Sequence, residues 1–358
     1  MTDWTDPETF AAALEAVTTK QKGNHFEEFT EGETIEHAPG LGLSRHASEL
    51  WAGQTLNHDP MYWRTDAARA RGFEEPPVHP DYLLAAVMGP SVEDLSEKGG
   101  YFLGRDDVVV HDNAVYPGTD IRVESTVESK AASSSRPDYG IVTWRTRGID
   151  TGSGDVLVSY ERTNMVPRRE PLETDGGGTD GSSSEADGTH TDREGSLPVE
   201  FLTPEGPYFE DFAAALATAG ADAAVAYRHE RGRTMDDPLV SGLPLSTLNT
   251  ARQHHNRDAM ADSPSGEIVA YGDVTRSVAL GHARSDEATY RELEYGEETF
   301  HDFVTLGDTV YGFTRVLEVD GDAGPGGVGR VKFEHIAFNQ REKPVYSGTR
   351  AALIERRG

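Results

Sequence analysis

The residues best suited to chemistry lie in one short loop of the second half, TLNTARQHHN. In this loop the carboxamide of Asn249 is followed, five positions later, by the imidazole of His254. A histidine exchanges protons near neutral pH, whereas an asparagine amide can only hold a water molecule or fix a ring. A metal site at His254 and His255 is disfavoured, because adjacent side chains do not converge on one ion without further ligands. On residue type alone, a lone loop histidine is more often structural than catalytic.

A second group of residues lies where a helix with an apolar face begins, at Gly272 and Asp273 in YGDVTRSVALGH. The first backbone N–H groups of a helix are unpaired and carry partial positive charge, so they can stabilise an oxyanion. A glycine there lets a ligand approach without a Cβ in the way, although close packing of helix on sheet explains it equally well. The matching apolar helix of the first half is DYLLAAVMG, where Asp81 is expected to cap the helix.

The two halves of the chain repeat each other. The paired arginines that close the last strand-like run, at positions 168 and 356, are 188 residues apart. The segment VYPGTDIRVESTV matches VTLGDTVYGFTRVLEV at a similar offset, and FEEF near the N-terminus matches FEDF after the midpoint. Matches in the same order at a near-constant offset indicate an internal duplication.

Each repeat contains an apolar helix followed by three or four long runs of alternating hydrophobicity, which predicts an α+β fold with a sheet wrapped around a helix. We expect the two units to pack sheet to sheet. Between them, a stretch almost without apolar side chains, EPLETDGGGTDGSSSEADGTHTDREGS, is predicted to be a flexible linker. The predicted domains are therefore 1–169 and 199–358, with the linker at 170–198.

The composition excludes several classes of protein. A net charge of −29, few lysines and a pI near 4.7 give no basic face for nucleic acid. Acidic residues spread along the whole chain suit solubility at molar salt, where the Debye length falls to about 3 Å. The absence of cysteine excludes disulfides and thiolate chemistry. No leader or membrane-spanning stretch is evident, so a cytoplasmic protein of a salt-adapted microbe that does not bind membranes is expected.

These motifs resemble the MaoC-like acyl-CoA hydratases, whose loop carries a polar residue and, five positions later, a histidine. Asn249 and His254 match that spacing, and Tyr271-Gly272 matches the His-Gly step that opens the family's long helix. In the first half, Asn57 matches the polar residue, Tyr62 replaces the loop histidine, and His79-Pro80 stands at the step. The resemblance implies a double hotdog fold with a degenerate first-half site.

Within that family the chain is most similar to the mesaconyl-CoA hydratase group. The segments NTARQHH, IVAYGDV and FNQREKPV carry this likeness, which covers nearly the whole chain outside the linker. The general family motif has an aspartate where this chain has Asn249, a departure that the mesaconyl-CoA group shares. The resemblance implies reversible hydration of mesaconyl-CoA (2-methylfumaryl-CoA) to β-methylmalyl-CoA, in the methylaspartate cycle of halophilic archaea.

The resemblance also implies roles for individual residues. His254 is expected to act as the acid and base that transfers the protons of the water molecule and of the α-carbon. Asn249 is expected to orient the water molecule or the imidazole ring. Substrate contacts are expected at the following positions: Gly272, Asp273, Tyr271, Tyr62, His79 and Asp81. Arginines pair well with phosphate and carboxylate, so those near the second loop and helix are candidates for CoA or a substrate carboxylate, namely Arg252, Arg257, Arg276 and Arg284.

Several alternatives stay open. CoA enters as part of the substrate, so no separate cofactor or metal is expected. A hydratase of another enoyl-CoA, a thioesterase using Asp81 or Asp273, and a non-catalytic acyl-CoA-binding protein all fit the same fold. The oligomeric state is also open, with a homo-oligomer as one possibility.

Overall fold

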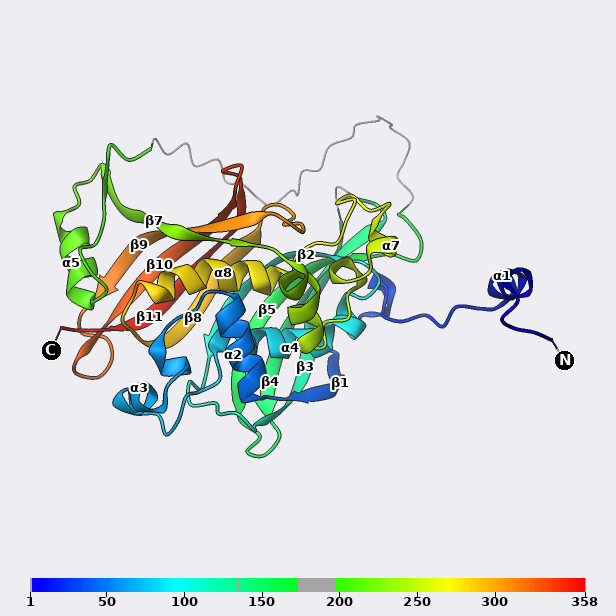
Figure 1. The fold of residues 1–358 in the computed structure, drawn as a ribbon, viewed down its shortest axis with the longest axis horizontal. Coiled ribbons are helices and arrows are strands. Elements are labelled where there is room, and N and C mark those ends of the chain that lie inside the picture. The colour runs from blue at the N-terminus through cyan, green and yellow to red at the C-terminus, as the bar shows by residue number, and fades with distance from the viewer. Residues whose placement is uncertain (1, 134–135, 173–196, 358) are drawn as a thin grey trace.

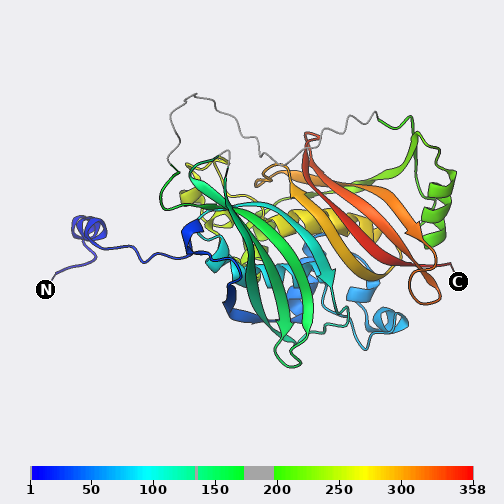
Figure 2. The same ribbon diagram turned by 180° about the vertical axis from the view of Figure 1, so that it is seen from behind.

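The computed structural model describes residues 2–133, 136–172 and 197–357. Its body is one large curved sheet with two long helices on the same face (Figure 1). Those helices are α4 (Pro80–Leu95) and α8 (Gly272–Ser285). In the view from behind, no helix crosses the centre of the opposite face (Figure 2). This arrangement confirms the predicted α+β class.

The strands of the first half and of the second half form a single sheet in the described part of the chain. Its order is β1-β3-β4-β5-β2-β8-β11-β10-β9-β7-β6. The bounds are β1 Thr34–Gly42, β2 Tyr101–Val110, β3 Asp120–Ala132, β4 Tyr139–Asp150, β5 Val156–Pro167, β6 Glu200–Leu202, β7 Ala223–Thr234, β8 Thr289–Phe300, β9 Thr309–Asp320, β10 Val328–Asn339 and β11 Pro344–Glu355.

The expectation that the halves pack sheet to sheet is wrong. They join edge to edge, through antiparallel pairing of β2 with β8. Each of these strands would otherwise leave a row of backbone N–H and C=O groups unpaired. Joining the two edges satisfies those groups and makes one continuous sheet.

The duplication is visible in the order of the strands. Reading outward from the junction, the first half runs β2-β5-β4-β3-β1 and the second runs β8-β11-β10-β9-β7. Strand starts in the two halves differ by 188 or 189 residues for all five pairs, as for β5 and β11 at 156 and 344. The remaining strand, β6, extends the far edge of the second half.

The smaller helices are α1 Pro7–Ala16, α2 Arg45–Gln54, α3 Thr65–Ala70, α5 Phe209–Thr218, α6 Leu243–Ser246 and α7 Arg257–Met260, with short turns at Phe26–Glu28, Pro60–Tyr62, Pro238–Gly242 and Arg252–His254. Among them, α2 packs on the two long helices, with Trp51 Nε1 donating to Ser277 Oγ at 3.0 Å, and α5 lies near the far edge of the second half (Figure 1). Helix α1 has no buried residue and stands away from the body (Figure 1). No helix among the described residues is long and apolar enough to cross a membrane. The predicted linker lies mostly at 173–196, outside the described residues.

The two long helices cross loops from the opposite half at glycines. A Cβ on Gly89 of α4 would lie 1.6 Å from the carbonyl oxygen of Thr247, and one on Gly281 of α8 would lie 2.0 Å from that of Thr55. Each loop reads Thr-Leu-Asn, and the leucines have positive φ angles of 62° at Leu56 and 63° at Leu248. Each half therefore holds the loop of the other by direct backbone contact.

A buried chain of ion pairs also crosses the junction. Its nine residues alternate in charge in the order Asp273, Arg105, Glu298, Arg276, Asp81, Arg284, Glu292, Arg350 and Glu287. All are buried, and they come from β2, α4, α8, β8, β11 and the turn between α8 and β8. A buried charge is costly unless it is paired, so this network of ion pairs couples the two halves at their centre.

Candidate active site

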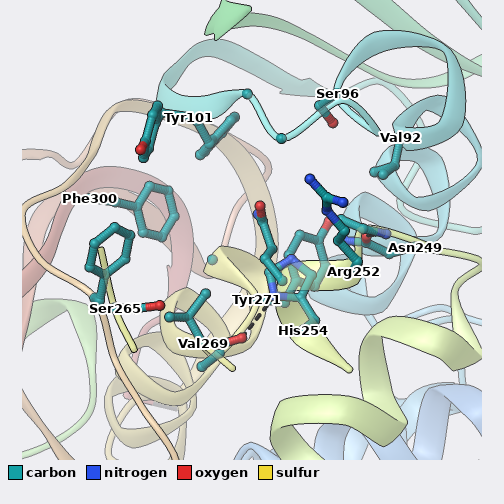
Figure 3. Close-up of a pocket in the computed structure, with 18 of the residues that line it drawn as sticks. Val92, Ser96, Tyr101, Asn249, Arg252, His254, Ser265, Val269, Tyr271 and Phe300 are labelled. Carbon is teal, nitrogen blue, oxygen red and sulfur yellow. Dashed lines mark hydrogen bonds between the residues drawn. The ribbon is translucent and has the colours of Figure 1, made fainter. Parts of the chain in front are cut away.

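A cavity of about 390 Å³ lies between the two halves beside the predicted catalytic loop. The second half contributes the loop, the start of α8 and Phe300 of β8, while the first half contributes the end of α4, the start of β2 and part of β5. Figure 3 shows side chains from both halves facing the same space, Ser96 and Tyr101 from one and His254 and Tyr271 from the other. Its walls include both apolar and charged side chains.

His254 lines this cavity at the end of the short turn Arg252–His254 and is only 4% exposed. Its Nδ1 lies 2.8 Å from the carbonyl oxygen of Val269 (Figure 3), which can only accept, so Nδ1 carries the proton. Burial lowers the pKa of His254 to about 4, against the opposing effect of that hydrogen bond. Among the described residues none bonds to Nε2, so the neutral ring offers a free lone pair to a ligand.

Asn249 lies on the same wall and is 1% exposed. Its Oδ1 accepts from the backbone N–H of Ala251 at 3.1 Å, which fixes the turn that leads to His254. The NH₂ group of the side chain remains available as a donor in the cavity. The predicted pair, Asn249 and His254, is therefore brought together.

The start of α8 forms the neighbouring wall, with Tyr271, Gly272 and Asp273 all lining the cavity. Backbone N–H groups of Gly272 and Asp273 have no acceptor among the described residues, as expected in the first turn of a helix. The Tyr271 hydroxyl donates to Asp273 Oδ2 at 2.6 Å, and Arg105 binds the same carboxylate. A Cβ on Gly272 would lie 2.8 Å from the Phe300 ring, so packing also requires this glycine.

The arrangement places a neutral base, an amide donor and free helix N–H groups around one space. Comparison with known proteins identifies the family of this chain. A family model described as mesaconyl-CoA hydratase matches residues 3–356. A protein of Haloarcula marismortui named mesaconyl-CoA hydratase is 65% identical, with 99% of each chain covered. The chain belongs to the mesaconyl-CoA hydratase family.

Solved structures agree on the fold. A MaoC domain dehydratase from Chloroflexus aurantiacus superposes with a TM-score of 0.78 at 20% identity, covering 96% of this chain and all of that one. A Mycobacterium tuberculosis protein described as a double hotdog superposes with a TM-score of 0.71 at 19% identity, covering 92% and 98%. The double hotdog prediction is confirmed.

In this family member the corresponding first-half residues form no such site. The duplication aligns Tyr62 with His254 and His79 with Tyr271, so histidine and tyrosine have exchanged positions. His79 Nε2 is bonded to the Asn57 amide at 2.6 Å, and its Nδ1 accepts from the N–H of Asp81 at 3.2 Å. Pro80 aligns with Gly272 and has no N–H to offer.

Two first-half predictions change as a result. The N-cap of α4 is His79 rather than Asp81, because the imidazole can reach the first-turn N–H while the carboxylate turns inward. Asp81 instead forms ion pairs with Arg276 and Arg284 in the buried chain. Tyr62 packs on the His79 ring at 4.5 Å. The structure places none of these first-half residues on the wall of the cavity.

The four predicted arginines separate into three environments. Arg252 is exposed and lines the cavity. Arg257 pairs with Asp237 at 2.9 Å on the surface, away from the cavity lining. Arg276 and Arg284 are at most 1% exposed and bound to carboxylates, also away from the lining. Only Arg252 is placed to meet a ligand there.

Among the cavity-wall residues that sequence reasoning missed are Arg162 and Asn164 of β5. Both are inward-facing polar residues in a strand whose alternation predicts apolar ones, SYERTNMV. That break in the alternation was the available signal.

Proposed function

We propose that this protein is a hydro-lyase that reversibly adds water across the conjugated double bond of mesaconyl-CoA (2-methylfumaryl-CoA), giving β-methylmalyl-CoA. The observation that carries the proposal is the buried, neutral His254 with Nε2 free toward the cavity, beside unpaired N–H groups at the start of α8. Membership of the mesaconyl-CoA hydratase family supports the same substrate.

Water addition to an enoyl thioester needs a base for the water and a stabilised enolate. Water held by Asn249 and His254 attacks the β-carbon, forming a C–O bond while Nε2 takes a proton. The π electrons move to the thioester oxygen, which receives hydrogen bonds from the N–H groups of Gly272 and Asp273. The enolate then collapses, and Nε2 returns the same proton to the α-carbon.

One titrating group on one side of the substrate requires both new bonds to form on the same face. Hydration in deuterated water, followed by stereochemical analysis of the product, should therefore show syn addition. Anti addition would require a second proton donor on the opposite wall and would refute this mechanism.

The direct test follows the loss of conjugated-enoyl absorbance on incubation with mesaconyl-CoA in molar KCl. His254→Gln should lower kcat at least about 1,000-fold, since the general base is lost. The adjacent His255→Gln is the matched control and should keep most of the activity, because the His255 ring bonds the Thr250 carbonyl and does not line the cavity. Release of free thiol would indicate a thioesterase, and an inactive wild type that still binds the thioester would indicate a binding protein.

The finer setting is part of the same proposal. We infer a cytoplasmic enzyme of the methylaspartate cycle that works at high salt. A net charge of −29 and a relative from Haloarcula marismortui support this setting. Activity that falls as KCl is diluted below the molar range is expected, and full activity in dilute buffer would contradict it.

A further inference from the structure

Arg162 of β5 is a buried cation without a counter-ion. It is 2% exposed, lines the cavity, and has no carboxylate within ion-pair distance among the residues described. Its hydrogen bonds all go to neutral groups: Nε to Asn164 Oδ1 at 3.0 Å, Nη1 to Ser91 Oγ at 2.8 Å and Nη2 to Ser96 Oγ at 2.9 Å. A guanidinium has five N–H donors, so two remain for a ligand.

In the second half, the buried arginine at the equivalent position has two counter-ions. Arg350 of β11 aligns with Arg162, and Glu292 and Glu287 neutralise it. Ala352 of β11 aligns with Asn164 of β5. Strand pairing places Glu292 opposite Ala352 and Phe102 opposite Asn164, so Phe102 occupies the position that corresponds to Glu292. The first half therefore replaces the carboxylate with a phenyl ring, which lies 6.0 Å from the Arg162 guanidinium.

The pKa values of the two arginines shift in opposite directions for this reason. Burial lowers the pKa of Arg162, whereas the pKa of Arg350 is raised because its two glutamates outweigh the effect of burial. Asp273 acts on Arg162 only from beyond ion-pair distance and is itself bound to Arg105. Leaving a buried charge unpaired is costly, so a ligand that supplies the missing negative charge would bind strongly.

Asn164 completes the site. It is 1% exposed, and its Nδ2 has no partner among the described residues. Because Arg162 Nε holds Oδ1, the NH₂ group is the end left for a ligand. An unpartnered amide donor beside an unneutralised guanidinium matches a carboxylate, which only accepts hydrogen bonds.

We propose that Arg162 and Asn164 bind the free carboxylate of a dicarboxylic acyl-CoA and thereby select it over neutral enoyl-CoA thioesters. This rests on the proposed function and names the residues that set its substrate class. In the mesaconyl group the free carboxylate is attached to the β-carbon, so binding it also fixes that carbon relative to His254. CoA phosphates are far from the acyl end and suit the exposed Arg252 at the same cavity.

The test compares pairs of ligands that differ only in the carboxylate. Turnover is measured with mesaconyl-CoA and with tiglyl-CoA, which has a methyl group in place of the carboxylate. Competitive inhibition is measured with succinyl-CoA and with butyryl-CoA, and it needs no turnover of the neutral ligand. In Arg162→Gln, kcat/KM for mesaconyl-CoA and affinity for succinyl-CoA should fall on the order of 100-fold, while the neutral ligands are unaffected.

Arg252→Gln is the matched control, because losing a phosphate contact should weaken all four thioesters to the same degree. If Arg162→Gln does not fold, Asn164→Ala keeps the charge and should lose about tenfold for the carboxylate ligands alone. An unchanged preference for carboxylate in these variants would overturn the assignment. If wild-type protein does not hydrate mesaconyl-CoA at all, the proposed function fails instead, and the succinyl-CoA to butyryl-CoA ratio still reports on Arg162.

Discussion

The pH dependence of hydration tests the state of His254 directly. General base catalysis needs the neutral ring, and burial lowers the pKa of His254 to about 4. At pH 5 about nine-tenths of the enzyme would then be active, whereas an ordinary histidine pKa of about 6.5 would leave about 3% and cut the rate roughly 30-fold. We therefore expect kcat/KM for mesaconyl-CoA to stay nearly constant from pH 7 to pH 5.

The measurement is the initial rate of absorbance loss at low substrate concentration, in molar KCl, from pH 8 to pH 4.5. Stability must be followed separately, because a pKa lowered in the folded state means that protonation favours unfolding. That contribution to stability is fully present above about pH 6.5 and is lost as the pH falls toward about 4. Samples held at each pH and assayed at pH 7 separate the two effects. A reversible acid limb centred near pH 6.5 would refute the assignment of a buried, neutral base.

Three further outcomes follow from the packing. Gly281→Ala should lower the melting temperature or abolish folding, because the new Cβ would lie 2.0 Å from the Thr55 carbonyl oxygen. Glu298→Gln should cost about 3–5 kcal/mol of unfolding free energy in chemical denaturation, since it leaves two buried arginines short of charge, while the exposed neighbour Glu297→Gln should change it by less than about 0.5 kcal/mol. Asn249→Ala should lower kcat more than it raises KM, because the turn that leads to the His254 ring loses its hydrogen bond.

Much of the fold follows from patterns in the sequence. The apolar runs predicted helices α4 and α8, and the offset of 188 predicted the repeated strands. The junction between β2 and β8 was not predictable, because alternation tells which face of a strand is buried and not which edge it pairs with. The capping role of His79 was missed for a similar reason, since an aspartate at the same helix start is the commoner cap.

The site was predicted unevenly. The spacing of Asn249 and His254 identified the loop, because both residues come from one short segment. Arg162 could not be assigned, since its significance lies in a missing partner, and a sequence does not show which carboxylates surround an arginine. The same limit applies to Arg276, which resembled a ligand-binding arginine but is bound to Asp81 and Glu298.

The first half has Phe102 at the position where the second half has Glu292, and this difference bears on how a duplicated chain acquires an asymmetric binding site. In a dimer of identical subunits, each residue of the wall formed by β5 occurs twice, once in each subunit. The same residue would then have to suit both positions. Fusing the copies into one chain removes that constraint. In the second half Glu292 remains the counter-ion of Arg350. In the first half Phe102 stands in its place, which leaves Arg162 available to the substrate.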